Sequence, residues 1–137
     1  MHEPTMLKDR SKAARIVLAG VIPTLVGALA GVMIGASLTA YWIVAVVAGV
    51  GGILAGFEHE DGWGGADRGL LGGFLYGVGL LLAHWIAGTH AKVSLGSFVP
   101  LFAVVTAIIG MFLGALGGRL GRALRHAPGV VLERDAR

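Results

Sequence analysis

The sequence contains no cysteine and little charge. Without cysteine the chain can form no disulfide, thiolate nucleophile or thiolate metal site, and composition gives no information about its redox compartment. Charged residues make up 14% of the 137 residues, whereas an ordinary soluble domain carries about 25%. No Asp, Glu, Lys or Arg lies between Ile16 and Phe57, and Lys92 is the only such residue from Gly69 to Thr106. Uncharged runs of this length are typical of segments that cross a bilayer.

Patterns that would indicate enzymatic chemistry are also missing. No serine lies between the spaced glycines of a nucleophile elbow. The glycine run at 62–65 lacks the lysine and the hydroxyl residue that hold phosphates in a phosphate-binding loop. We therefore expect a non-enzymatic protein without a bound cofactor or metal.

The basic residues are concentrated near the two ends of the chain, and the net charge is +3. Such a charge can indicate nucleic-acid binding, but here the cations flank apolar runs, where membrane topology and anionic lipid explain them. We therefore expect the lipid bilayer, and no nucleic acid, as a partner. Arg119, Arg122 and Arg125 are spaced by three, which predicts one helix face lying against anionic lipid headgroups.

Glycine is abundant, with 24 residues, and much of it recurs every four residues inside the apolar runs. In water, a glycine inside a helix costs about 1 kcal/mol relative to alanine. In lipid, the missing side chain lets two helix backbones touch, so this spacing predicts close helix packing. The glycines predicted to lie at helix contacts are Gly27, Gly31, Gly35, Gly52, Gly56, Gly69, Gly73, Gly77, Gly110, Gly114 and Gly118.

The apolar runs predict an all-α integral membrane protein with four transmembrane helices, arranged as two helical hairpins packed through their glycine faces. The predicted spans cover residues 16–38, 41–57, 69–87 and 98–118. A cytoplasmic N-terminal segment at 1–15 precedes them, and a basic cytoplasmic tail at 119–137 follows. Pro23 is expected to bend or loosen the first span, and Thr39 and Ala40 to connect it to the second.

The charges outside the spans predict the orientation. Lysine and arginine mark cytoplasmic segments, so we expect both termini in the cytoplasm and the protein in the inner (plasma) membrane of a prokaryotic cell. Trp42 and Trp85 then both fall at the outer interface, where amphipathic rings are enriched. The first apolar run is longer than the core of a signal peptide, which is about 7–15 residues, so we expect it to be retained.

The segment from Glu58 to Arg68 is acidic, and its glycines predict a loop. Asp67 is expected to cap the helix that follows. The carboxylates and His59 could bind a divalent cation, but their spacing matches no common metal loop, so a solvated loop is the favoured interpretation. We expect Arg68 to extend toward the lipid surface, with phosphate binding as the alternative.

His84 is the ionisable side chain within a span that is not plainly terminal. It lies within about a turn of the predicted helix end, beside Trp85. An interfacial role is therefore expected, and a proton or ligand site is the alternative.

A glycine-rich helix end at 51–56 is followed by acidic residues at 58–61 and by a glycine-rich helix start at 67–73. This order resembles a family of uncharacterised, small four-span membrane proteins of prokaryotes. The resemblance implies the fold, and it implies no activity, because such families have none assigned.

The small-residue faces are wider than an isolated bundle requires, which favours a non-enzymatic membrane module that associates with itself or with a larger membrane complex. An oligomeric channel or transporter for an ion or small solute is the alternative, although few polar side chains are available to line a pore. An enzyme that acts at the membrane surface through residues 58–67 is a third, less favoured possibility.

Overall fold

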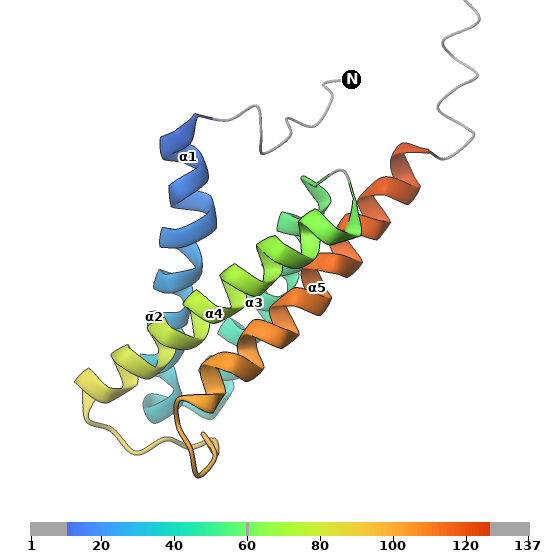
Figure 1. Ribbon diagram of the computed structural model, residues 1–137. Coiled ribbons are helices and arrows are strands. Elements are labelled where there is room, and N and C mark those ends of the chain that lie inside the picture. The colour runs from blue at the N-terminus through green and yellow to red at the C-terminus, as the bar shows by residue number, and fades with distance from the viewer. Residues whose placement is uncertain (1–10, 60, 127–137) are drawn as a thin grey trace, which may run out of the picture.

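The structure of the chain is a computed structural model that describes residues 11–59 and 61–126 (Figure 1). Within these residues the secondary structure is helical, with turns and bends between the helices and no strand. Four helices are long and apolar enough to cross a membrane. The predicted all-α class with four membrane-length helices is therefore confirmed. Most of the predicted N-terminal segment and the end of the predicted basic tail lie outside the described residues.

The first of these helices, here called the N-terminal helix, runs from Lys12 to Ala36. It comprises α1 (Lys12–Ile16), the π-helical turn η2 (Val17–Val21) and α2 (Ile22–Ala36). Pro23 lies in the first turn of α2, directly after the π-helical turn. Proline has no backbone donor, so the regular hydrogen-bond pattern changes where the sequence predicted a loosened helix.

A single residue, Ser37, separates α2 from α3 (Leu38–Phe57). Ser37 is extended, with φ −150° and ψ 121°, and its hydroxyl accepts a hydrogen bond from the backbone N–H of Ala40 at 3.3 Å. Serine is a favourable N-cap because its hydroxyl pairs with a donor that has no partner inside the helix. Thr39 and Ala40 therefore lie in the first turn of α3, and the predicted connection at these two residues is wrong.

The third long helix, α4 (Gly62–Ala87), begins earlier than predicted. Asp61 caps it by accepting a hydrogen bond from the N–H of Gly64 at 2.8 Å, whereas Asp67 lies inside the helix. The predicted capping role of Asp67 is therefore wrong. Gly62 and Gly65 are helical despite their low intrinsic preference, because they lie against α5.

α4 ends at Ala87, where Gly88 adopts the left-handed conformation (φ 62°) that favours glycine at a helix C-terminus. An irregular connection leads to Pro100, which directly precedes α5 (Leu101–Arg125). This last helix begins later than predicted and continues beyond the predicted span end at 118. The arginines predicted for the tail, Arg119, Arg122 and Arg125, thus extend the fourth long helix.

α4 is the central helix of the molecule. It packs along α5 on one side and along α2 on the other, and these two contacts are the most extensive (Figure 1). α3 packs mainly against α5, and less extensively against α2 and α4. Sequence neighbours therefore form the α4–α5 pair, whereas α2 packs more extensively against α4 than against its own neighbour α3.

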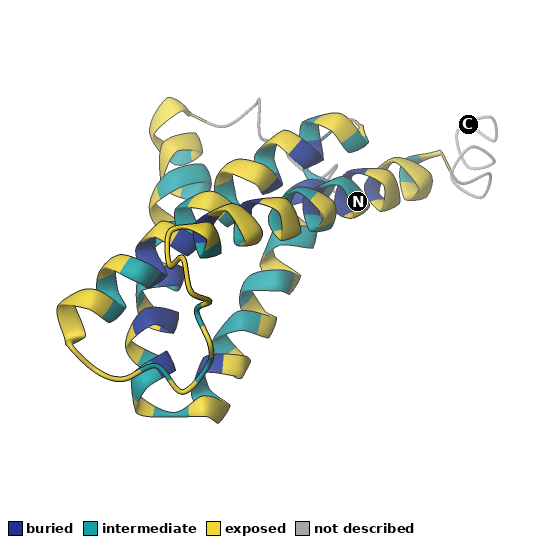
Figure 2. Cartoon of the chain, turned by 60° about the horizontal axis from the view of Figure 1, so that its bottom comes forward, coloured by how far each residue is buried: buried dark blue, intermediate teal, exposed yellow. Residues whose placement is uncertain are grey.

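Few side chains are buried. Ala30, Ile34, Tyr41 and Leu80 form the core cluster. Figure 2 shows buried residues where helices face one another and exposed residues on their outer sides. This distribution suits a bundle whose outer surface faces hydrocarbon, since lipid supplies no hydrophobic force to bury large side chains.

Candidate functional site

Backbone contacts between α4 and α5 depend on glycine. A methyl group added at Gly69 would overlap the carbonyl oxygen of Gly110, and one added at Gly110 would overlap the carbonyl oxygen of Gly69. The same reciprocal relation joins Gly65 and Gly114. Along the same pair of helices, Gly73 lies against Thr106, Gly77 against Ala103 and Gly118 against Asp61. These positions have no room for a side chain, so the two backbones pack directly on each other.

The N-terminal helix approaches α4 in the same way. Methyl groups added at Gly27 and Gly31 would overlap the carbonyl oxygens of Tyr76 and Leu80, respectively. Gly35 differs, because it faces the side chain of Thr89, in the connection after α4, rather than a helix backbone. The close contact between α2 and α4 is therefore concentrated at the first two glycines of the predicted series.

α3 uses its predicted glycines unequally. A methyl group added at Gly56 would overlap the carbonyl oxygen of Gly114. At Gly52 the nearest atom would be Cβ of Leu113, at an ordinary 3.8 Å, so Gly52 makes no backbone contact. Gly65, Gly79 and Gly117 also meet a neighbouring backbone.

Two backbone carbonyls of the N-terminal helix lose their helical donors near Pro23. Proline offers no N–H to the carbonyl of Ala19, four residues earlier. The N–H of Ile22 donates to the carbonyl of Val17 across the π-helical turn, so the carbonyl of Leu18 also lacks its usual partner. Carbonyls between packed helices require other donors, because leaving them unpaired away from water is unfavourable.

Arg68 of α4 supplies these donors. Its Nη2 donates to the carbonyl of Leu18, and its Nη1 donates to the carbonyl of Ala19 at 3.5 Å. Gly72, one turn further along α4, leaves space for the guanidinium, since a methyl group there would lie 3.0 Å from Nη1. The expectation that Arg68 extends to the lipid surface is therefore wrong. The sequence does hold a signal for this contact, namely a proline inside a predicted span.

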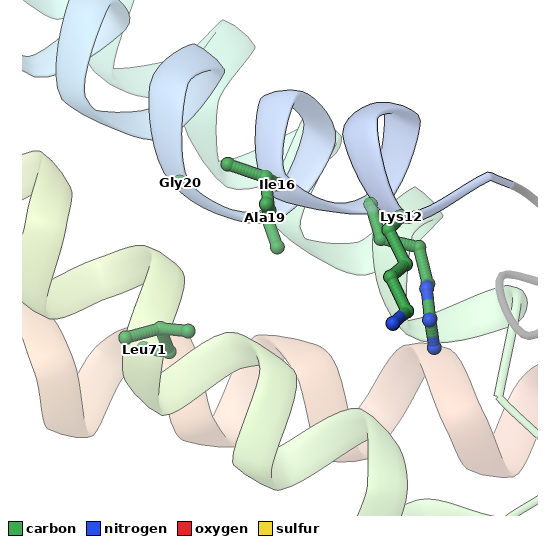
Figure 3. Close-up of a pocket in the computed structure, with 6 residues that line it drawn as sticks. Lys12, Ile16, Ala19, Gly20 and Leu71 are labelled. Carbon is green, nitrogen blue, oxygen red and sulfur yellow. The ribbon is translucent and has the colours of Figure 1, made fainter.

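A groove lies beside this contact, between the N-terminal helix and α4 (Figure 3). Its volume is about 480 Å³. Lys12 and Arg15 give it two exposed cations, and the remaining lining is apolar. Figure 3 shows the Lys12 side chain extending toward α4, where Leu71 lies on the facing helix. The lining residues are Lys12, Arg15, Ile16, Ala19, Gly20 and Leu71.

The three arginines predicted to contact lipid headgroups have different surroundings. Arg125 donates from Nη1 to the carbonyl of Phe57 at 3.0 Å and from Nη2 to the carbonyl of His59 at 2.6 Å. It thereby pairs with carbonyls at the C-terminal end of α3, where a positive charge is favoured. Arg125 is consequently engaged within the chain, and its predicted contact with headgroups stays a prediction. Arg119 and Arg122 are exposed, so their predicted contact with headgroups stays a prediction.

The described acidic residues around the start of α4 form no common site. Asp61 caps the helix, Asp67 is exposed, and Nδ1 of His59 lies 3.2 Å from the carbonyl oxygen of Ala55. Among residues 11–59 and 61–126, no group of three or more His, Asp or Glu side chains could hold a metal ion. The divalent-cation interpretation of this segment therefore gains no support from the described residues.

His84 lies near the end of α4, beside Trp85, which is 79% exposed. Its Nδ1 atom is buried, as is Oη of Tyr76, and neither atom has a hydrogen-bond partner within the described part of the chain. The interfacial role of His84 stays a prediction.

No family model, curated protein or solved structure matches the chain. The resemblance to small four-span proteins therefore stays a prediction. The groove is shallow and open, and it is the candidate site because two cations lie beside its apolar lining.

Proposed function

We propose that this chain is a non-enzymatic membrane module that associates with a second copy of itself through α3, with a larger membrane protein as the alternative partner. The observation that supports this proposal is the open space beside Gly51 in the middle of α3. Apart from the backbone of its own helical turns and its two chain neighbours, no described atom lies within 4 Å of the position that a Cβ of Gly51 would occupy. A glycine inside a helix costs about 1 kcal/mol relative to alanine, and a second helix packed on α3 would use the space that Gly51 leaves.

The surface around Gly51 fits such a contact. Tyr41 and Gly56, near the two ends of α3, are its buried residues, whereas the middle of the helix is largely exposed. We call this surface the α3 outer face, and it consists of Val46, Val47, Val50, Gly51 and Leu54. Branched side chains around a glycine provide a shallow depression into which a second helix can pack.

Leucine substitutions at two glycines distinguish a loss of association between chains from a loss of folding. Gly51→Leu places a large side chain on the α3 outer face without disturbing a contact inside the chain, so we expect a folded monomer in mild detergent. Gly31→Leu disrupts the α2–α4 contact, so we expect loss of the fold. The readouts are mass by light scattering and helicity by circular dichroism. A Gly51→Leu variant with the mass of the wild-type protein would contradict association through this face.

Cross-linking in native membranes provides a second readout, because the chain has no cysteine of its own. We expect oxidation to join two chains through Gly51→Cys. Gly20→Cys is the matched control, since Gly20 is the other described helical glycine with no atom within 4 Å and lies on the N-terminal helix. Cross-linking of both variants to the same extent would indicate random collision and count against the proposal.

We also propose an inner-membrane location in a prokaryotic cell, with both termini in the cytoplasm. The cations near the two ends of the described chain support this orientation under the positive-inside rule. A membrane-impermeant maleimide should then label Ser94→Cys, in the α4–α5 connection, from outside intact spheroplasts. Labelling only after the membrane is opened would contradict the orientation.

A further inference from the structure

We propose that the groove between the N-terminal helix and α4 binds one anionic phospholipid. Lys12 and Arg15 would contact the phosphate, and the apolar lining would contact an acyl chain. The site is separate from the α3 outer face, so this proposal does not depend on self-association. It follows from three properties of the groove, namely its charge, its apolar lining and its fixed width.

Two exposed cations give the groove a positive charge. Lys12 and Arg15 are one turn apart at the start of the N-terminal helix, and both are exposed. No hydrogen bond or ion pair to another described residue engages either side chain. Arg68 and Arg125 differ from this pair, because their side chains donate hydrogen bonds to backbone carbonyls. The pair is therefore complementary to a phosphate group.

The rest of the lining is apolar and lacks bulk at its centre. Ile16 and Leu71 provide the larger side chains, while Ala19 and Gly20 leave the backbone of the N-terminal helix open. No described atom outside its own helical turns lies within 4 Å of the position that a Cβ of Gly20 would occupy. A groove with a cationic end and an otherwise apolar lining matches a phospholipid better than it matches a small hydrophilic anion.

Arg68 sets the width of the groove. Further along the N-terminal helix, Gly27 allows direct backbone contact with α4, but at Leu18 and Ala19 the guanidinium of Arg68 lies between the two helices. The helices diverge beyond this point toward Lys12, as Figure 1 shows. Because hydrogen bonds hold this separation, the groove exists before any ligand enters it, and less ordering is needed on binding.

The test uses a fluorophore in the groove and brominated lipids that quench it. Gly20→Cys carries the single label, since the position is open and the chain has no native cysteine. Ile109→Cys is the control, because it is an exposed residue on α5 away from both the groove and the arginines at the end of that helix. Each protein is reconstituted in phosphatidylcholine vesicles that contain a minor fraction of phosphatidylglycerol, with one of the two lipids brominated.

We expect the label at position 20 to be quenched preferentially by brominated phosphatidylglycerol, and the label at position 109 to show no such preference. Lys12→Gln with Arg15→Gln should lower the relative affinity for phosphatidylglycerol by roughly 30-fold, since each cation contributes about fivefold near an anionic surface. Arg119→Gln with Arg122→Gln removes the same charge elsewhere and should leave the preference unchanged.

Four results would overturn the proposal. The first is equal quenching by the two lipids at position 20, and the second is a preference that survives loss of both groove cations. The third is suppression of the preference by inorganic phosphate, which would assign the site to a free anion. The fourth is a label at position 20 that neither brominated lipid reaches, which would show that protein fills the groove. Unchanged quenching at position 109 and unchanged helicity by circular dichroism in the Lys12→Gln, Arg15→Gln protein show that the variant is folded.

Discussion

At the scale of single residues, cations of this chain serve as donors to backbone carbonyls. Arg68 donates to carbonyls near Pro23, Arg125 to those at the end of α3, and Nζ of Lys92 to the carbonyl of Ala36 at 2.8 Å, at the end of α2. All three satisfy acceptors that a helix cannot pair by itself. The sequence shows where such acceptors arise, but it does not show which distant cation reaches them.

The pairing of Arg68 with the proline break can be measured as a coupling energy. Arg68→Gln removes the donors to two carbonyls, so we expect it to lower the free energy of unfolding by about 1–3 kcal/mol. Pro23→Ala restores the missing backbone N–H. In the Pro23→Ala background, Arg68→Gln should therefore cost less, and the two substitutions should be non-additive. The measurement is a double-mutant cycle of unfolding in detergent, and strictly additive effects would show that the two residues act independently.

At the scale of secondary-structure elements, four spans could be predicted because the length of an uncharged apolar run is a local property of the sequence. The helix boundaries were harder to predict. Asp61 and Asp67 are both acceptable N-caps for α4, and the local sequence does not decide between them. Contact with α5 decides in favour of Asp61, since it holds Gly62 and Gly65 in a helix that their own preferences oppose.

The start of α4 provides a test of this assignment. Asp61→Ala removes the acceptor of the Gly64 N–H, so we expect a loss of about 1 kcal/mol in stability and faster hydrogen exchange at Gly64. Asp67→Ala is the control, because Asp67 lies inside the helix and is exposed. The opposite pattern, with faster exchange only in Asp67→Ala, would place the start of the helix where the sequence alone predicted it. The readout is hydrogen–deuterium exchange resolved by peptide.

At the scale of the whole molecule, the order of the helices could not be read from the sequence. Small residues recur at the same spacing in all four spans, so this spacing predicts contact without naming the partner. Gly27 and Gly31 thus face α4 rather than the adjacent α3, and Gly52 faces a side chain. The groove was also hidden, because it depends on Arg68, which separates two helices that are distant in sequence.

Close backbone contact between α4 and α5 is central to this arrangement, and the free energy of unfolding tests it most directly. Gly69→Ala and Gly51→Ala are compared with the wild-type chain in a detergent that keeps the protein monomeric. We predict that Gly69→Ala loses about 1–3 kcal/mol, because its methyl group overlaps the backbone at Gly110. Gly51→Ala should lose nothing and gain up to about 1 kcal/mol from helix preference, because its methyl group meets no described atom outside its own helical turns. Equal stabilities for the two variants, or a larger loss for Gly51→Ala, would contradict the contact.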